Sequence, residues 1–263
     1  MIEGWWIFPL LGIAAGIMAG LLGIGGGLVL VAALVWLFPT FGVSPDTAVH
    51  AALATSMASI IFTGTSSALA HHRRGSVLWP SVKWLVPGML LGGWLGSLFA
   101  LSLDGTVLRW CVAIYCWLAG AQMAFGRTRA ALGQEAVPTG AALTAAGGGI
   151  GAVSAVVGIG GGSMTVPYLV WRGVAPVRAV GTSSTCGVFI ALAAAAGYAL
   201  NAPGGALPSH AVGYVYLPAA IGVAVASVLS APLGTRIAHA ISGKALRMVF
   251  AVFMLLVGIS MLV

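Results

Sequence analysis

Charged residues are scarce in this chain of 263 residues, at 6% of the sequence against about 25% in an ordinary soluble domain. Eleven residues are basic and four are acidic, which is too few to cover the surface of a soluble protein of this size. Because 60% of the residues are hydrophobic, the low charge does not indicate disorder. The composition therefore predicts an integral membrane protein embedded in a lipid bilayer. At about 20 residues per span, the length allows about ten spans with short loops.

Residues suited to catalysis or metal binding are also few. With four acidic residues, the chain has little to use in acid–base or metal chemistry, and HExxH, GxSxG and paired carboxylates are all lacking. The cysteines Cys111, Cys116 and Cys186 lie in apolar stretches without CxxC spacing, which is typical of small core residues. We therefore expect no enzyme activity, no cofactor and no metal. The net charge of +7 is better explained by basic cytoplasmic loops than by nucleic-acid binding.

Glycine, in contrast, is abundant, with 39 residues. Apolar segments separated by short polar or proline-containing breaks cover 5–38, 47–70, 80–101, 107–125, 139–171, 179–200, 212–233 and 245–263. They predict an all-α polytopic membrane protein. The segments 5–38 and 139–171 are each interrupted by the motif GxGGG, where adjacent glycines disfavour a continuous helix. We expect each of these two segments to be a broken-helix hairpin.

The second half of the chain repeats the first. Four motifs recur in the same order: GIGGG at 23–27 and 158–162, GVSP at 42–45 and GVAP at 173–176, Thr-Ser at 55–56 and 182–183, and an apolar stretch beginning Leu-Arg at 108–123 and 246–261. Two unrelated apolar segments would not keep this order, so the pattern indicates an internal duplication. We divide the chain into membrane repeats at 1–126 and 139–263, joined by a cytoplasmic linker at 127–138.

The distribution of basic residues predicts the direction of the two repeats. If each GxGGG segment crosses the membrane once, the basic residues divide about evenly between the two sides. If each returns to its own side, one side holds Arg73, Arg74, Lys83, Arg127, Arg129, Arg172, Arg178, Arg236, Lys244 and Arg247, and the other holds Arg109. The second arrangement fits the excess of basic residues in cytoplasmic loops. It predicts two inverted repeats, each a hairpin followed by three transmembrane helices, with both termini outside the cytoplasm.

The broken helices are the first candidate site. A helix that begins inside the membrane directs its free N–H groups and its positive dipole end into the cavity, which can hold an anion without a fixed charge. The alternative is that the glycines only allow close helix packing. The candidate binding residues in the two breaks are Gly25, Gly26 and Gly27, and Gly160, Gly161, Gly162 and Ser163.

Hydroxyl and ionisable side chains inside apolar segments add further candidates. The repeated pairs, Thr55-Ser56 and Thr182-Ser183, can donate hydrogen bonds to an oxyanion or can bond their own helices. Asp46 and His50 have the i, i+4 spacing of one helix face, which allows a proton relay or a solvated helix entrance. Arg178 either attracts an anion or marks a cytoplasmic helix end.

These residues lie in segments that resemble the sulfite exporter TauE/SafE family of membrane transporters. The resemblance covers nearly the whole chain and rests on GLLGIGGGLVLV (20–31), ALATS (52–56), ALAHHRRGSV (68–77), GIGGGSMTVPYLV (158–170) and APVRAVGTSS (175–184). It implies transport of small sulfur-containing anions such as sulfite, thiosulfate or sulfoacetate, by export across a bacterial inner membrane.

The sequence thus predicts a secondary transporter that works by alternating access. The alternatives are an anion channel with the same glycine-lined site, a carrier for another small organic anion, or a structural membrane subunit. The expected partners are the transported anion and the lipid bilayer, with a homodimer as the alternative to a monomer.

Overall fold

The computed structural model describes the backbone of residues 4–22, 26–125, 137–205, 207, 210–240 and 243–262. The elements within these ranges are α1 Ile7–Leu22, α2 Gly27–Leu37, the short 3-10 helix η1 Phe38–Phe41, α3 Pro45–Arg73, α4 Trp79–Leu101, α5 Gly105–Phe125, α6 Ala141–Val157, α7 Gly162–Trp171, α8 Pro176–Leu200, β1 Ala211–Val212, β2 Val215–Tyr216, α9 Leu217–Ala240 and α10 Gly243–Ser260. The helices α3, α4, α5 and α8 are long and apolar enough to cross a bilayer. The prediction of an all-α polytopic membrane protein is therefore confirmed.

Each GxGGG segment is a pair of short helices. α1 and α2 have 16 and 11 residues, and α6 and α7 have 17 and 10. At about 1.5 Å per residue, α2 and α7 each rise only about 15 Å, or half of a hydrocarbon core of about 30 Å. Each segment is thus broken into two helices at its glycine motif, as expected, and both second helices begin with a buried glycine. Of the predicted site residues, Gly25 lies outside the described residues, as do 126–136, which include most of the predicted linker.

The repeated motif before α3 and α8 has the same local structure in both halves. Pro45 and Pro176 occupy the first turn of their helices, where the missing N–H of proline leaves no hydrogen bond unmade. The preceding residues, Ser44 and Ala175, share the backbone angles φ −58° and ψ 138°. The sequence duplication is thus also present in the backbone.

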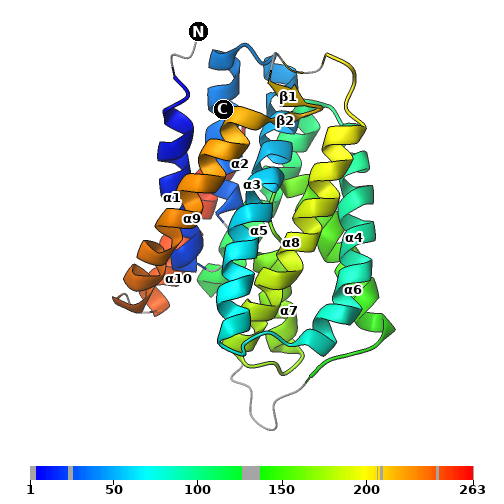
Figure 1. Cartoon of the computed structure of the whole chain (residues 1–263), viewed down its shortest axis with the longest axis vertical. Coiled ribbons are helices and arrows are strands. Elements are labelled where there is room, and N and C mark those ends of the chain that lie inside the picture. The colour runs from blue at the N-terminus through cyan, green and yellow to red at the C-terminus, as the bar shows by residue number, and fades with distance from the viewer. Residues whose placement is uncertain are drawn as a thin grey trace.

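The two halves exchange their packing partners. α1 packs along α9, while α6, at the equivalent position in the second half, packs along α4. α3 packs against α8, and α5 against α10. Figure 1 shows the α4–α6 and α1–α9 pairs on opposite sides of the central helices, with both chain ends at the same end of the bundle.

Glycine residues allow α4 and α6 to approach closely. Gly88, Gly92 and Gly96 lie at i, i+4 and i+8 on α4, and a Cβ on any of them would clash with backbone carbonyls of α6. The carbonyls belong to Thr144, Gly148 and Ala152 in that order. Close approach through small residues is typical of helix pairs in membranes.

Basic residues gather at one end of the bundle. Arg73 lies at the end of α3, Lys83 in the first turns of α4, and Arg172 and Arg178 at the junction of α7 with α8. The N–H of Leu78 donates to Thr182 Oγ1, which joins the start of α4 to the start of α8 at this end. In Figure 1, the end of α7 and the loop that follows it point away from the two chain ends.

The opposite end carries a small β-hairpin that the sequence analysis missed. An apolar segment was expected over 212–233, but α9 begins only at Leu217, and Ala211 and Val212 pair with Tyr216 and Val215. Gly213, with φ 58°, makes the turn. The ring of Tyr216 packs against Phe8 and Phe38, with centroids 5.9 and 5.7 Å away. The β1–β2 hairpin therefore continues the hydrophobic core at this end of the bundle.

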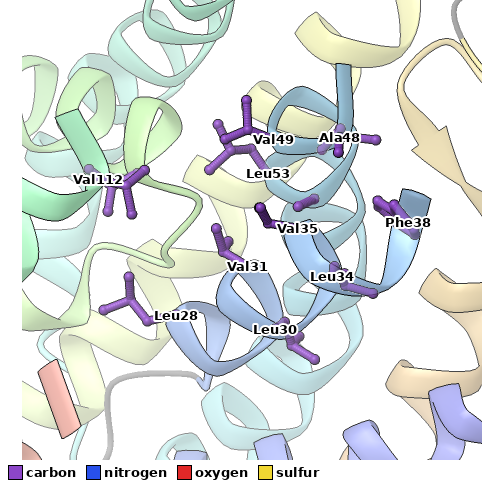
Figure 2. Packing of buried hydrophobic residues seen from close by; sticks show 14 of the residues in the cluster. Leu28, Leu30, Val31, Leu34, Val35, Phe38, Ala48, Val49, Leu53 and Val112 are labelled. Atoms are coloured by element: carbon purple, nitrogen blue, oxygen red, sulfur yellow. The ribbon is translucent and has the colours of Figure 1, made fainter. Parts of the chain in front are cut away.

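The largest cluster of buried apolar residues gathers α1, α2, α3 and α5 with the β1–β2 strands. Leucine and valine side chains of α2 pack against the first turns of α3 and against Val112 of α5 (Figure 2). Large apolar side chains also cover the outside, including Leu91 on α4, Leu118 on α5 and Leu229 on α9. An apolar exterior is what a bilayer requires.

Candidate anion-binding site

The two glycine breaks have the same backbone geometry. Gly26 precedes α2 with φ 59° and ψ −4°, and Gly161 precedes α7 with φ 72° and ψ −2°. Both lie in the left-handed region that only glycine adopts without strain. Neither helix has a side-chain hydrogen bond that caps its N-terminus. Each helix therefore begins with N–H groups that are available to a ligand.

The two breaks also lie next to each other. A Cβ on Gly27 would come within 2.7 Å of the carbonyl oxygen of Gly158. On the other side of the second break, a Cβ on Gly187 of α8 would lie 2.5 Å from the carbonyl oxygen of Gly160. The first break, the second break and α8 thus pass one another at backbone contact, which brings together the predicted residues Gly26, Gly27, Gly160, Gly161 and Gly162.

Ser56 connects the two breaks. Its hydroxyl donates to the carbonyl oxygens of Gly27 and Gly158, at 3.2 and 3.0 Å. The side chain is fully buried. Because one hydroxyl hydrogen serves two carbonyls, this group is already occupied as a donor. Ser56 therefore lies at the predicted place but fixes the breaks to each other.

Thr55 and Thr182 make equivalent contacts in the two halves. Thr55 Oγ1 accepts the N–H of Tyr216 at 3.1 Å, just before α9 begins. Thr182 Oγ1 accepts the N–H of Leu78 at 2.9 Å, just before α4 begins. Both threonines are buried, and each holds the start of a long helix of the other half. Each oxygen accepts a structural hydrogen bond, which leaves the hydroxyl hydrogen able to donate, and the role toward an anion stays a prediction.

Ser183 differs from Ser56, its counterpart in the first half. Its Oγ is buried and has no hydrogen-bond partner among the described residues. Ser163, in the first turn of α7, bonds the hydroxyl of Tyr115 on α5. Tyr115 was not identified from the sequence, because nothing in the sequence pattern brings α5 next to the second break.

Asp46 and His50 are not brought together by the helix. Asp46 is exposed at the first turn of α3. His50 is buried, and its Nε2 lies 3.2 Å from the carbonyl oxygen of Ala100 and 3.1 Å from that of Leu103, so this nitrogen is the donor. Its ring stacks on Tyr214 with a centroid distance of 5.4 Å. Burial raises the pKa of the Tyr214 phenol.

Arg178 lies in the first turn of α8, at the basic end of the bundle and away from the breaks. The structure therefore places it as a helix-end residue, and the anion-attracting role stays a prediction. The cysteines are free thiols. Within the described ranges, His, Cys, Asp and Glu form no group of three or more that could hold a metal ion.

Comparison with known proteins gives one consistent result. A family model described as sulfite exporter TauE/SafE matches residues 8–261. A "Probable membrane transporter protein" of Haemophilus influenzae is 34% identical over 258 residues, covering 96% of each chain. A protein with the same description from Methanocaldococcus jannaschii is 26% identical, covering 97% of this chain and 96% of its own. The relative YunE of Bacillus subtilis is 35% identical over 97 residues, which is 35% of this chain and 36% of its own. No solved structure gives a significant match.

Proposed function

The chain belongs to the sulfite exporter TauE/SafE family of membrane proteins, and from this premise we propose that it exports small sulfur-containing oxyanions by alternating access. The substrates would be sulfite, thiosulfate or an organosulfonate such as sulfoacetate. The membrane would be the inner membrane of a bacterium, with both chain ends on the outer side.

One observation carries this proposal: two uncapped helix N-termini begin side by side in the middle of the bundle. A helix N-terminus has a partial positive charge of about half an elementary charge and free N–H donors. The residues that begin α2 and α7, Gly27 and Gly162, are both buried. Such a site attracts an anion without a buried Lys or Arg side chain. A buried positive charge would hold the anion too tightly for release.

The arrangement of acidic residues disfavours a cation as substrate. Of the acidic residues in the described ranges, Asp46 and Asp104 are both exposed at the ends of helices. A cation crossing the bundle would need oxygen ligands of negative charge near the midplane.

The inside-negative membrane potential also favours export of an anion, by about 2.3 kcal/mol per charge for each 100 mV.

The exchange of packing partners between the halves supports inverted repeats. The long helices α3 and α8 run in opposite directions, because the end of α3 and the start of α8 meet where Gly181 contacts Ser76. The basic residues Arg73, Lys83 and Arg172 share the end away from the chain termini, as a cytoplasmic side requires. Inverted repeats with broken helices are the architecture of many secondary transporters.

Burial around the breaks favours a carrier over a channel. Ser56, Gly27 and Gly162 are all buried, so an anion at the start of either helix would be enclosed by protein. A carrier must enclose its substrate during each cycle, whereas an open channel has a continuous wet path.

The test uses the full-length protein in two assays. Thermal unfolding in detergent with sulfite, thiosulfate, sulfate, sulfoacetate, taurine, chloride and the carboxylates acetate and succinate measures binding, because a ligand of the folded state raises the midpoint with its concentration. Radiolabelled thiosulfate in proteoliposomes then measures saturable uptake and counter-exchange. Selective stabilisation with counter-exchange supports the proposal. Unitary currents would establish the channel instead, and stabilisation by carboxylates alone would establish a carrier for another organic anion.

A further inference from the structure

Three buried hydroxyl groups border the second glycine break without using their hydrogens. Ser154, Thr165 and Ser183 are 0%, 1% and 1% exposed, and their hydroxyl oxygens have no hydrogen-bond partner among the described residues. A buried hydroxyl without a partner costs free energy, so three around one helix N-terminus need an explanation. A ligand that accepts hydrogen bonds would supply the partner.

The three residues approach the second break from three helices: Ser154 from α6, Thr165 from α7 and Ser183 from α8. Ser154 Oγ lies 3.2 Å from where a Cβ on Gly161 would be, directly beside the residue that precedes α7. Thr165 lies in the first turn of α7, and its N–H donates to the carbonyl of Gly161 at 2.8 Å. Ser183 on α8 lies one helical turn before Gly187, which contacts Gly160. The next turn of α8 brings Ile190 against Gly161.

The equivalent positions at the first break are apolar or already bonded. The GIGGG motifs align with an offset of 135 residues, so Ala19 corresponds to Ser154 and Leu30 to Thr165. Ala19 occupies the matching place, with its Cβ 3.3 Å from where a Cβ on Gly26 would be. Leu30 is part of the hydrophobic core drawn in Figure 2. Ser56, the counterpart of Ser183, already donates to two carbonyls.

We propose that the two breaks have different roles, and that the oxyanion binds at the second break alone. The N–H groups at the start of α7 and the hydroxyls of Ser154, Thr165 and Ser183 would be its donors. The first break is then a structural brace, held to the second by Ser56. This inference rests on the proposed function and adds the recognised group. A sulfo group presents three oxygens as acceptors, so it can use several donors at once, and it is common to sulfite, thiosulfate and sulfonates.

The first experiment compares hydroxyl deletions in the full-length protein. Ser154→Ala, Thr165→Val and Ser183→Ala should each weaken thiosulfate binding by about 10-fold, because hydrogen bonds to charged groups are the strong ones. Ser97→Ala is the matched control, since this buried hydroxyl bonds its own helix at Trp94. It should change affinity less than about 2-fold. Unchanged affinity in all three variants would overturn the proposal.

The second experiment locates the site with a covalent probe instead of an affinity measurement. In a background with Cys111, Cys116 and Cys186 replaced by alanine, Ser154→Cys and the matched Ala19→Cys are treated with a negatively charged methanethiosulfonate. We expect Ser154→Cys to react and sulfoacetate, whose sulfonate does not consume the reagent, to protect it, with neither effect for Ala19→Cys. Each variant is first checked for a monodisperse elution profile, and Ser183→Cys replaces Ser154→Cys if that variant fails.

The outcomes separate the two proposals. Equal protection of Ala19→Cys and Ser154→Cys would overturn the asymmetric site and leave sulfur-anion transport intact. Protection of Ser154→Cys by other anions, but not by any sulfur oxyanion, would retain the second break as the site and refute the proposed substrate. Absence of reaction at both Ser154→Cys and Ser183→Cys would overturn the site.

Discussion

The hydroxyl of Ser56 donates to the carbonyl oxygen of Gly158, 3.0 Å away, across 102 positions of sequence. This bond joins a helix of the first half to the glycine break of the second. The same hydroxyl also lies 3.2 Å from the carbonyl oxygen of Gly27. One side chain thus links both breaks at the centre of the molecule.

Ser56→Ala should therefore destabilise the protein. Two carbonyls would each lose the hydrogen bond from Ser56, at a cost of about 1–3 kcal/mol. Thermal unfolding of the detergent-purified protein measures the loss as a lower midpoint. The control is Ser227→Ala on α9, whose buried hydroxyl bonds the carbonyl of Ala224 in its own helix at 3.1 Å. An equal midpoint for Ser56→Ala and wild type would show that the link does not stabilise the fold.

Thr55→Val and Thr182→Val should lower stability by similar amounts. Each removes the acceptor of a buried backbone N–H, from Tyr216 or from Leu78, at about 1–3 kcal/mol. The substitutions by serine, Thr55→Ser and Thr182→Ser, keep the oxygen and should retain most of the stability. Thermal midpoints compare the four variants. If valine and serine behave alike, the hydroxyl is not the stabilising group.

The sequence contains enough information to predict where the main helices of this protein begin and end. The glycine-rich motifs predicted where α1 and α6 end, and the repeated proline motif marks where α3 and α8 begin, because both are local backbone effects. A further signal in the sequence, for the close α4–α6 pair, lies in the glycines of α4. Gly88, Gly92 and Gly96 have the four-residue spacing typical of close helix pairs.

The contacts of the candidate site could not be predicted in the same way. Ser56 and Ser183 occupy equivalent sequence positions, yet one bonds two carbonyls and the other has no partner among the described residues. The difference depends on which backbone lies opposite, and that is set by packing between the halves. The i, i+4 spacing of Asp46 and His50 likewise placed them on one helix without indicating that His50 turns inward to the end of α4.

Gly92→Val should separate α4 from α6. The new side chain would overlap the carbonyl of Gly148, and overpacking of this kind costs about 1–3 kcal/mol or more. The control is Gly148→Ala on the facing helix, where a Cβ would lie at an ordinary distance of 3.8 Å from the carbonyl of Gly88. Thermal unfolding should show a lower midpoint for Gly92→Val only. Loss of stability in both variants would mean that the whole interface tolerates no added atom.

Asp46→Asn and His50→Ala should have different effects. Asp46 is exposed, so its carboxylate contributes only through the dipole of α3, by about 0.3–1 kcal/mol, and thiosulfate flux should stay close to that of wild type. His50→Ala removes the donor to two carbonyls and the stacking on Tyr214, so the unfolding midpoint should fall. Proteoliposome flux and thermal unfolding measure the two effects. A large loss of flux in Asp46→Asn, with stability unchanged, would support the proton relay instead.

Gly161→Ala should abolish anion binding while the protein remains folded. Gly161 has φ 72°, where a side chain costs about 1–2 kcal/mol, and a Cβ would meet Ile190 Cδ1 at 2.6 Å and Ser154 Oγ at 3.2 Å. The backbone before α7 must then shift, which misdirects the N–H groups at its start.

The matched control for this substitution is Gly149→Ala on α6, an exposed helical glycine with nothing within 4 Å of its Cβ position. Alanine there should leave binding intact and stabilise the helix by about 0.5–1 kcal/mol. Thiosulfate-dependent thermal shifts, with elution profiles as a check on folding, compare the two variants. Wild-type affinity in a well-folded Gly161→Ala protein would show that the anion does not depend on the geometry before α7. The affinity of a ligand bound at the second break should change, because the substitution moves the backbone N–H donors of the ligand and crowds Ser154.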